Sequence, residues 1–351
     1  MSSFCIHVLD VGHGDSIILE LPNNNWGVID CFKITNESEP PALTFLKARN
    51  VKRLKFVCLT HPHYDHYHGM LEILKHFAAD GAQIEEFWDF GMDKDKLHVF
   101  KERCGSEKEF TELQRLYDFI LDKVLNEGIP YLEAKQNTKC LDWNNIKIFS
   151  LAPIGHDTIK YIRSLGKDIR IDENLLSVVL VVTCGQTNVI LGSDTKSWQD
   201  ILGLWRKECV TSKGRKRGFD FVKVSHHGSR EGNDNGLWKS FTVTDKSVAV
   251  ISTGCKYNLP HKETITSITS SKVRLYSTNF RDFSKPTSPD SLERFQEKGF
   301  ISQSILEALE SSTLPAETFE IIAPYHGNCS ITVHDNHECL VSTEYNRPPI
   351  T

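Results

Sequence analysis

Long hydrophobic runs are missing from this sequence of 351 residues. The longest apolar stretch, residues 175–182, is interrupted by Ser177 and is much shorter than the roughly 20 residues that a membrane-spanning helix requires. The residues before Phe4 offer none of the charged, apolar and small-residue regions of a secretory signal. We therefore expect a cytoplasmic protein that does not contact a membrane.

Paired cysteines and glycine-rich phosphate loops are missing as well. The ten cysteines never occur as Cys-x-x-Cys, and Cys5, Cys31, Cys58 and Cys184 lie in or beside strand-like runs. This distribution predicts reduced core residues and argues against a disulfide framework or a zinc knuckle. The sequence also contains no phosphate-binding loop of the Walker type.

A strong charge of either sign is missing too. The formal net charge is −5, with 39% hydrophobic and 25% charged residues, which is typical of a globular protein with a large core. This charge gives no global attraction to nucleic acid, so a polyanion would need a local basic patch or a metal. The compact basic run of the sequence contains Lys213, Arg215, Lys216 and Arg217. It is either a solvated loop or a rim that guides phosphate groups, and its position just before residues 218–224 keeps the second interpretation open.

The order of apolar and turn-forming residues predicts a mixture of strands and helices. A helix is expected at residues 107–125, because its apolar positions share one face and Gly128 follows as a stop signal. Strands are expected at residues 4–9, 16–21, 26–29, 54–60, 146–151, 175–182, 188–191, 247–252 and 272–277, with a closing hairpin at about 327–343.

One stretch carries the strongest chemical signal. The apolar run 54–60 predicts a buried strand, and the loop after it contains His61, His63, Asp65 and His66. Loops beyond the carboxyl ends of strands are where α/β sheets bind ligands, and imidazole and carboxylate groups at this spacing suit two neighbouring metal ions. The alternative is a polar loop that happens to be rich in histidine.

The motif of residues 60–69 resembles the signature of the metallo-β-lactamase superfamily. Further segments resemble, in the same order, the hydrolase domain attached to the DNA-uptake channel protein ComEC, although that domain usually has Gln where His13 stands. These segments are residues 4–32, 174–180, 191–194, 224–229 and 257–263. The resemblance implies an α/β fold, the four-layer αββα sandwich, formed by residues 1–351 as one domain with its site at one edge.

The resemblance also implies a set of metal ligands. His61 and His63 match two ligands of a first site, and Asp65 and His66 match two ligands of a second. Asp194, in the motif 192–194, matches the carboxylate that bridges both metals. In the motif 225–229, His226 matches the last ligand of the second site, whereas His227 faces substrate. Asp65, His227 and His261 are the candidate catalytic residues, and His261 is a candidate proton donor to a phosphate or a leaving oxygen.

Asn174 marks a departure from the wider superfamily, in which many enzymes have a histidine ligand of the first site at this position. ComEC-type domains resemble this chain in having Asn there. An amide oxygen suits manganese or magnesium better than zinc. We therefore expect one or two divalent ions, zinc or manganese, with Asn174 as a tentative ligand.

Three further residues are expected to support the site without binding metal. An Asp at the position of Asp30 usually supports the metal loop through hydrogen bonds in the superfamily. His13 and Asp15 lie in the turn that coincides with the opening motif of the resemblance, so they are candidate groups lining the site.

These observations predict a metal-dependent hydrolase that activates water, and the resemblance to a domain associated with DNA degradation implies a phosphodiesterase or nuclease. Its expected substrate is a phosphodiester, with nucleic acid as a candidate. One alternative is hydrolysis of a small ester or a cyclic nucleotide. Another is a partner-gated effector or interaction subunit of a multi-protein system, such as one for anti-phage defence, which would need a protein partner.

Overall fold

The structure is a computed structural model, and it describes most of the chain between residues 3 and 343. The described residues are 3–34, 37–79, 83–91, 97, 100–101, 104–164, 172–208, 218–233, 237–238, 247–252, 259–278, 328–335 and 338–343. The basic run with Lys213, Arg215, Lys216 and Arg217 lies outside these residues.

The first sheet contains eight strands in the order β17-β16-β1-β2-β3-β5-β7-β8. Its strands are β1 Ser3–Val8, β2 Ser16–Leu21, β3 Asn25–Cys31, β5 Phe56–Cys58, β7 Phe87–Asp89, β8 Tyr131–Glu133, β16 Cys329–His334 and β17 Cys339–Thr343. The strands predicted at residues 4–9, 16–21 and 26–29 are found, and β1 pairs with β2 and β2 with β3 in the antiparallel sense. The two C-terminal strands pair antiparallel as well, and β16 joins the sheet beside β1.

The second sheet contains seven strands in the order β15-β14-β13-β12-β11-β10-β9. Its strands are β9 Thr138–Trp143, β10 Ile146–Ala152, β11 Val179–Cys184, β12 Thr187–Leu191, β13 Phe221–Lys223, β14 Val248–Ile251 and β15 Arg274–Ser277. The strands β12, β13, β14 and β15 run parallel to one another. A small separate sheet pairs β4 Arg53–Leu54 with β6 Gln83–Ile84, so the predicted strand 54–60 is in fact split between two sheets.

The predicted strand 175–182 begins later than expected. Residues Glu173–Leu176 form a short 3₁₀ helix, η2, and β11 starts only at Val179. The turn forms because the Asp172 side chain accepts a hydrogen bond from the backbone N–H of Asn174 at 3.0 Å, as a helix N-cap does. Asn174 therefore lies in a turn and does not open the strand.

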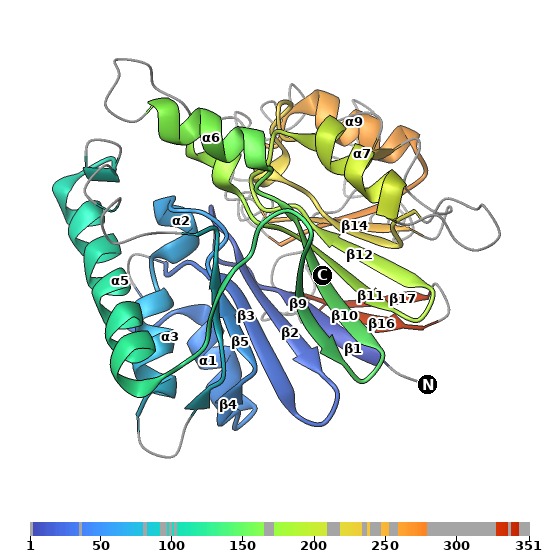
Figure 1. Cartoon of the computed structure of the whole chain (residues 1–351). Coiled ribbons are helices and arrows are strands. Elements are labelled where there is room, and N and C mark those ends of the chain that lie inside the picture. Colours follow the sequence, from blue (N-terminus) through green and yellow to red (C-terminus); the bar gives the residue numbers. More distant parts are fainter. Residues whose placement is uncertain are drawn as a thin grey trace, which may run out of the picture.

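Helices cover the outer faces of the two sheets (Figure 1). They are α1 Pro41–Ala48, α2 Tyr64–Tyr67, α3 Met70–Phe77, α5 Glu107–Glu127, α6 Gly155–Ser164, α7 Trp198–Glu208, η3 His226–Gly228 and α9 Lys262–Ser270. The predicted boundaries of α5 are nearly those observed, since Ser106 caps its start and Gly128 ends it in the left-handed conformation. In the described part of the chain, no helix is both long and apolar enough to cross a bilayer.

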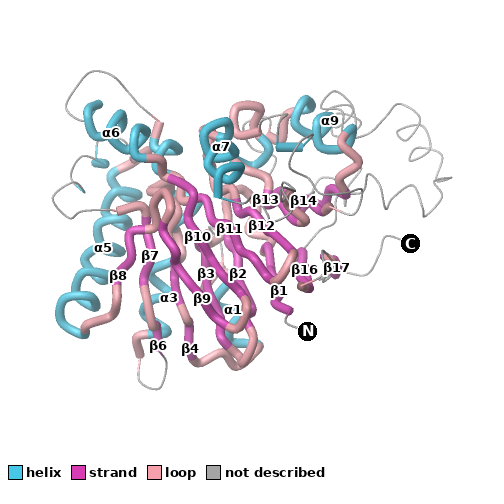
Figure 2. The backbone as a smooth tube through the Cα atoms, turned by 45° about the vertical axis from the view of Figure 1, so that its right-hand side comes forward, coloured by secondary structure: helices cyan, strands magenta, loops and turns pink. Residues whose placement is uncertain are grey.

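The strands of the second sheet separate two hydrophobic cores. In β11, Leu180 and Val182 pack into the core between the sheets, whereas Val179 and Val181 pack into a second core with Trp198 of α7. Side chains of a strand alternate between its two faces, so a strand that is apolar at every position must be covered on both sides. Figure 2 shows the sheets stacked between the helices, and the predicted four-layer αββα sandwich is confirmed.

Candidate metal centre

Loops from both sheets meet at one edge of the sandwich. Because β3 and β5 are parallel, the end of β3 with Asp30 lies beside the loop His61–His66 that follows β5. In the second sheet, β12 and β13 are parallel and lead into Asp194 and into the pair at positions 226–227. The carboxyl ends of parallel strands share an edge, which explains why residues far apart in sequence converge there.

Asp194 lies at the centre of this convergence. Its side chain is 2% exposed, and its Oδ2 atom lies within 4.0 Å of four imidazole Nε2 atoms. These belong to His66 at 3.5 Å, His227 at 3.8 Å, His61 at 3.9 Å and His226 at 4.0 Å. A single carboxylate among four imidazoles fits the bridging position that the sequence predicted for Asp194.

The two adjacent histidines are placed differently from the sequence prediction. The Nε2 atom of His227, not that of His226, lies against Asp65, at 3.1 Å from Asp65 Oδ2. His226 turns instead toward Asn174, whose Nδ2 lies 3.5 Å from His226 Nε2. Relative to the ligand set that the resemblance implies, the two rings have exchanged neighbours: His227 lies with Asp65 and His66, and His226 lies beside Asn174.

Backbone conformation explains this exchange. His226 and His227 both have positive φ angles, of 49° and 50°, and form the 3₁₀ turn η3. Ser193 and Asp30 at the same edge have φ angles of 46° and 54°. Residues with side chains rarely adopt this conformation, which costs on the order of 1–3 kcal/mol at each position and persists where the surroundings enforce it. Four such residues at one edge indicate that the surrounding structure holds the backbone, and with it the side chains, in fixed positions there.

Hydroxyl and carboxylate groups fix the tautomers of the histidines at this edge. Thr60 Oγ1 donates to Asp30 at 2.7 Å and Ser193 Oγ donates to Thr60 at 2.7 Å. Neither hydroxyl has a proton left for His61 Nδ1, which lies 3.1 Å from Thr60 Oγ1, so the ring carries its proton on Nδ1. The Nε2 atom of His61 is thereby left with a lone pair.

The same logic holds for two more rings. His66 Nδ1 donates to the carboxylate of Asp30 at 2.7 Å, and His227 Nδ1 donates to the carbonyl oxygen of Ser252 at 3.0 Å. Both neighbours only accept, so Nδ1 carries a proton in both rings, and in neutral His66 Nε2 is the unprotonated nitrogen. The Nε2 atom of His227 also faces an acceptor, Asp65 Oδ2, so this ring is placed between two acceptors. For His226 the partner is the hydroxyl of Ser229, which can donate or accept, so its tautomer is not fixed.

Burial and neighbouring charges shift the pKa values of these groups in opposite directions. Burial, with help from His66 and His63, lowers the pKa of His61 well below its usual value. Burial also opposes charge on His66 and His227, but Asp194 and the other carboxylates outweigh it and raise the pKa of both rings. The pKa of Asp194 is lowered, since His227 and His66 outweigh the opposing effect of burial.

These residues fit a divalent cation. The Nε2 atoms of His61 and His66 and the Oδ1 atom of Asp194 are buried and make no hydrogen bond within the described part of the chain. Buried polar atoms normally have a partner, so three such atoms around one carboxylate point to a bound ion. The combination of imidazole and carboxylate donors is the set that zinc and manganese use in proteins.

A buried ion pair lies behind His227. Lys223 is fully buried, and its Nζ atom lies 2.9 Å from Oδ1 and 3.0 Å from Oδ2 of Asp15. The Ser252 hydroxyl also donates to Asp15, and His227 Nδ1 lies 4.0 Å from the same carboxylate. Lys223 was missed in the sequence, although a lysine inside the apolar run of β13 is itself a sign of a buried charge.

His13 comes to the site directly. Its Nε2 atom lies 3.7 Å from Asp65 Oδ2, and its ring lies 4.5 Å from that of His227. Asp65, His13 and His227 therefore form a compact group on one side of Asp194. From the sequence, His13 was expected to line the site without binding metal. In the structure it lies directly against the candidate ligands Asp65 and His227.

Glu173 was also missed. Its carboxylate is buried beside the loop with His63, and its Oε2 atom lies 3.6 Å from His63 Nε2. The expectation from sequence was centred on its neighbour Asn174, and nothing in the pattern distinguishes the two positions. Their difference arises from the 3₁₀ turn, which gives successive side chains different directions.

His261 lies near the edge but outside the group around Asp194. It is the N-cap residue of α9, its backbone N–H donates to Gly228, and its Nδ1 accepts from the backbone N–H of Arg230 at 2.8 Å. The neutral ring consequently carries its proton on Nε2.

Part of the chain matches a known protein family. Residues 9–120 match the family model described as the Metallo-beta-lactamase superfamily, and this segment contains Asp15, Asp30 and the loop His61–His66. No curated protein sequence matches the chain.

Several solved structures are similar at low sequence identity. A diphosphatase from the PhnP family is 10% identical, with 82% of this chain and 93% of that chain covered and a TM-score of 0.39. The metallo-beta-lactamase fold protein YhfI from Bacillus subtilis is 10% identical, with coverages of 84% and 93% and a TM-score of 0.39. Human tRNase Z, short form, is 13% identical, with coverages of 78% and 92% and a TM-score of 0.35.

Proposed function

We propose that this chain is a metal-dependent hydrolase that cleaves phosphodiesters. The observation that carries the proposal is the pair of rings His61 and His66, whose Nδ1 atoms donate hydrogen bonds so that each Nε2 atom keeps a lone pair beside Asp194. A structural cluster would not need two buried imidazole nitrogens and the Oδ1 atom of Asp194 without hydrogen-bond partners among the described residues.

The ligand sets follow from the distances. Asp65, His66 and His227 would hold one ion on one side of Asp194, and His61 with His63 would hold the other. Divalent ions held in this way supply Lewis acidity and lower the pKa of a water to near neutral. The hydrogen bonds that the ring N–H groups donate to Thr60, Asp30 and Ser252 keep the rings oriented, and this costs no reorganisation during the reaction.

His261 is suited to the leaving group. Its Nε2 carries the proton, the ring is partly exposed, and it neighbours the turn that contains His227. It could therefore donate a proton to the departing oxygen while Asp65 orients the attacking water.

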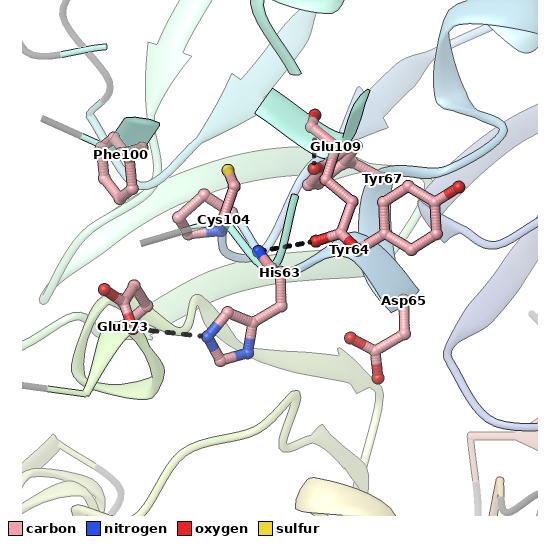
Figure 3. A pocket seen from close by; sticks show the side chains of 10 residues that line it. His63, Tyr64, Asp65, Tyr67, Phe100, Cys104, Glu109 and Glu173 are labelled. Carbon is pink, nitrogen blue, oxygen red and sulfur yellow. Dashed lines mark hydrogen bonds and ion pairs between the residues drawn. The ribbon is translucent and has the colours of Figure 1, made fainter. Parts of the chain in front are cut away.

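Nucleic acid as the substrate rests on the resemblance to the ComEC-type domain. A second candidate, a small diester, is favoured by a cavity of about 140 Å³ next to the ligand loop. Its lining includes His63, Tyr64, Asp65, Phe100, Glu109 and Glu173 (Figure 3). A cavity of this size accommodates only a small group.

Tyr64, which lines this cavity, keeps its proton at neutral pH. Burial, followed by the carboxylates of Glu112 and Glu109, raises the pKa of Tyr64 to about 12. A neutral or cationic leaving group would be better accommodated here than a second phosphate.

The test uses the full chain with added Mn²⁺ or Zn²⁺ and three substrates: bis-p-nitrophenyl phosphate, single-stranded DNA and a lactam. We expect the first to be hydrolysed and the lactam to be untouched. His227→Ala should lower the rate by roughly 100-fold or more, which is about 2.7 kcal/mol of transition-state stabilisation. The matched control is His156→Ala, because the His156 side chain is 61% exposed and contacts only Asp157 and Asp200 among the ion pairs described.

The outcomes separate the candidates. Cleavage of DNA with a steep salt dependence supports the nuclease, and cleavage of the small diester alone supports the second candidate. Turnover of the lactam without the diester, or equal loss of rate in both histidine variants, would refute the proposal.

A further inference from the structure

The short turn before β11 places a carboxylate where the sequence led us to expect an amide. We propose that Glu173, together with His61 and His63, binds the first metal ion, and that Asn174 is not its third protein ligand. This inference rests on the proposed metal-dependent function and adds an oxygen ligand that selects the metal.

Three observations around Glu173 support this role. Its side chain is 8% exposed, and its Oε2 atom lies 3.6 Å from His63 Nε2, a separation at which two atoms can bind the same ion (Figure 3). His63 in turn lies next to His61, with 4.6 Å between the ring centroids. The Nε2 atom of His61 is fully buried and makes no hydrogen bond within the described residues.

The neighbouring carboxylate is already engaged and serves a different purpose. Asp172 Oδ1 accepts from the N–H of Asn174, and its Oδ2 accepts from Lys196 Nζ at 2.6 Å. Lys196 also binds Glu231 at 2.7 Å. Asp172 thus fixes the turn, and the turn points the next side chain, Glu173, at His63.

Asn174 is directed elsewhere. Its Nδ2 atom lies 3.5 Å from His226 Nε2. Its Oδ1 atom is buried without a hydrogen bond, so it is the competing candidate that the experiment must exclude. A charged carboxylate balances a divalent ion in a buried site better than a neutral amide does.

An oxygen-rich first site has a chemical consequence. Two imidazoles and two carboxylates, from Glu173 and the shared Asp194, favour a harder ion than three imidazoles would. The first site should therefore bind Mn²⁺ relative to Zn²⁺ more favourably than a site with a third histidine.

The experiment is a titration of metal-free full-length protein with Mn²⁺ and with Zn²⁺, followed by calorimetry and by the electron paramagnetic resonance of free Mn²⁺. Glu173→Gln keeps the shape of the side chain and removes its charge. We expect it to weaken one of two Mn²⁺-binding steps by about 10- to 100-fold and to leave the other step unchanged. Glu173→His should restore binding but shift the preference toward Zn²⁺.

Two controls keep the result specific. Glu231→Gln removes the same charge from the partner of Lys196, whose other contact is Asp172, and should leave both binding steps within about 3-fold of wild type. Circular dichroism of each metal-free variant checks that the fold is retained.

Unchanged Mn²⁺ binding in folded Glu173→Gln would overturn the inference, as would a loss found in Asn174→Ala but not in Glu173→Gln. Both results leave the proposed function intact, because the wild type still binds metal. Wild-type protein that binds no divalent ion at all would refute the proposed function itself, and this inference with it.

Discussion

The Nε2 atom of His227 lies 3.1 Å from the Oδ2 atom of Asp65, although the two residues are 162 positions apart. This contact joins the loop after β5 of the first sheet to the turn after β13 of the second. It places His227, and not the adjacent His226, beside Asp65.

Substituting each of the two histidines should therefore have unequal effects on metal binding. We expect His227→Ala to lose the ion held with Asp65 and His66, whereas His226→Ala should retain it, since His226 faces Asn174. Elemental analysis and calorimetric titration of both variants measure the difference. If His226→Ala loses that ion and His227→Ala keeps it, the spatial assignment is wrong.

The carboxylate of Asp30 should be needed for metal affinity, although it contacts the candidate ligand His66 and not the metal itself. In Asp30→Asn, the acceptor for His66 Nδ1–H is weakened, so the ring loses its fixed tautomer and orientation. We expect metal affinity to fall by about 10- to 100-fold. Glu112→Gln is the matched control, because Glu112 binds His68 Nδ1 in the same manner outside the metal group. Equal affinities in the two variants would contradict the prediction.

Stability in acid should depend on Asp15. Lys223, and then His227, outweigh the opposing effect of burial and lower the pKa of Asp15. Since the folded pKa lies below the unfolded value of about 3.9, the stabilisation is present above roughly pH 4 and is lost as the pH falls through the folded pKa. Urea unfolding between about pH 2.5 and about pH 7 measures this loss.

The ion pair itself can be tested by a double-mutant cycle. Lys223→Met leaves a buried carboxylate without its cation and should cost roughly 3–5 kcal/mol at neutral pH. The double variant Asp15→Asn, Lys223→Met should be less destabilised than the sum of the single variants and should lack the acid-dependent component of Asp15. Additive effects of the two substitutions would show that the charges do not interact.

Gly14 should be required for the position of Asp65. Its φ angle is +146°, and a Cβ atom added there would lie 2.6 Å from the carbonyl oxygen of Asp65. Gly14→Ala should displace the loop and lower both metal affinity and activity. Gly128→Ala also adds a side chain at positive φ, but it meets nothing within 4 Å and should only lower stability, by about 1–2 kcal/mol. Titration and thermal unfolding of the pair separate the two effects.

Much of the fold could be predicted because its signals are local. The apolar run before His61 and the cap and stop signals around α5 each depend on a few neighbouring residues. The four-layer sandwich was expected from the resemblance, and it is confirmed. That residues 1–351 form one domain stays a prediction.

The details of the site could not be predicted for the opposite reason. Whether His226 or His227 reaches Asp65 depends on two successive left-handed residues, and no residue type requires that conformation there. Whether Glu173 or Asn174 faces His63 depends on a turn that replaces the first residues of a predicted strand. When the backbone conformation changes at one residue, a neighbouring side chain faces the site in its place. A correctly recognised motif therefore still leaves the ligand set open.

The pairing of β1 with β16 means that the first sheet can form fully only late in synthesis. His7 and Ser330, which face each other across these strands, are 323 positions apart. During synthesis on the ribosome, β1 therefore emerges long before its partner, and one of its edges has no neighbour until the last strands appear. The turn that contains Asp15 follows β1 directly. Its final position is therefore fixed only after nearly all of these residues have been synthesised.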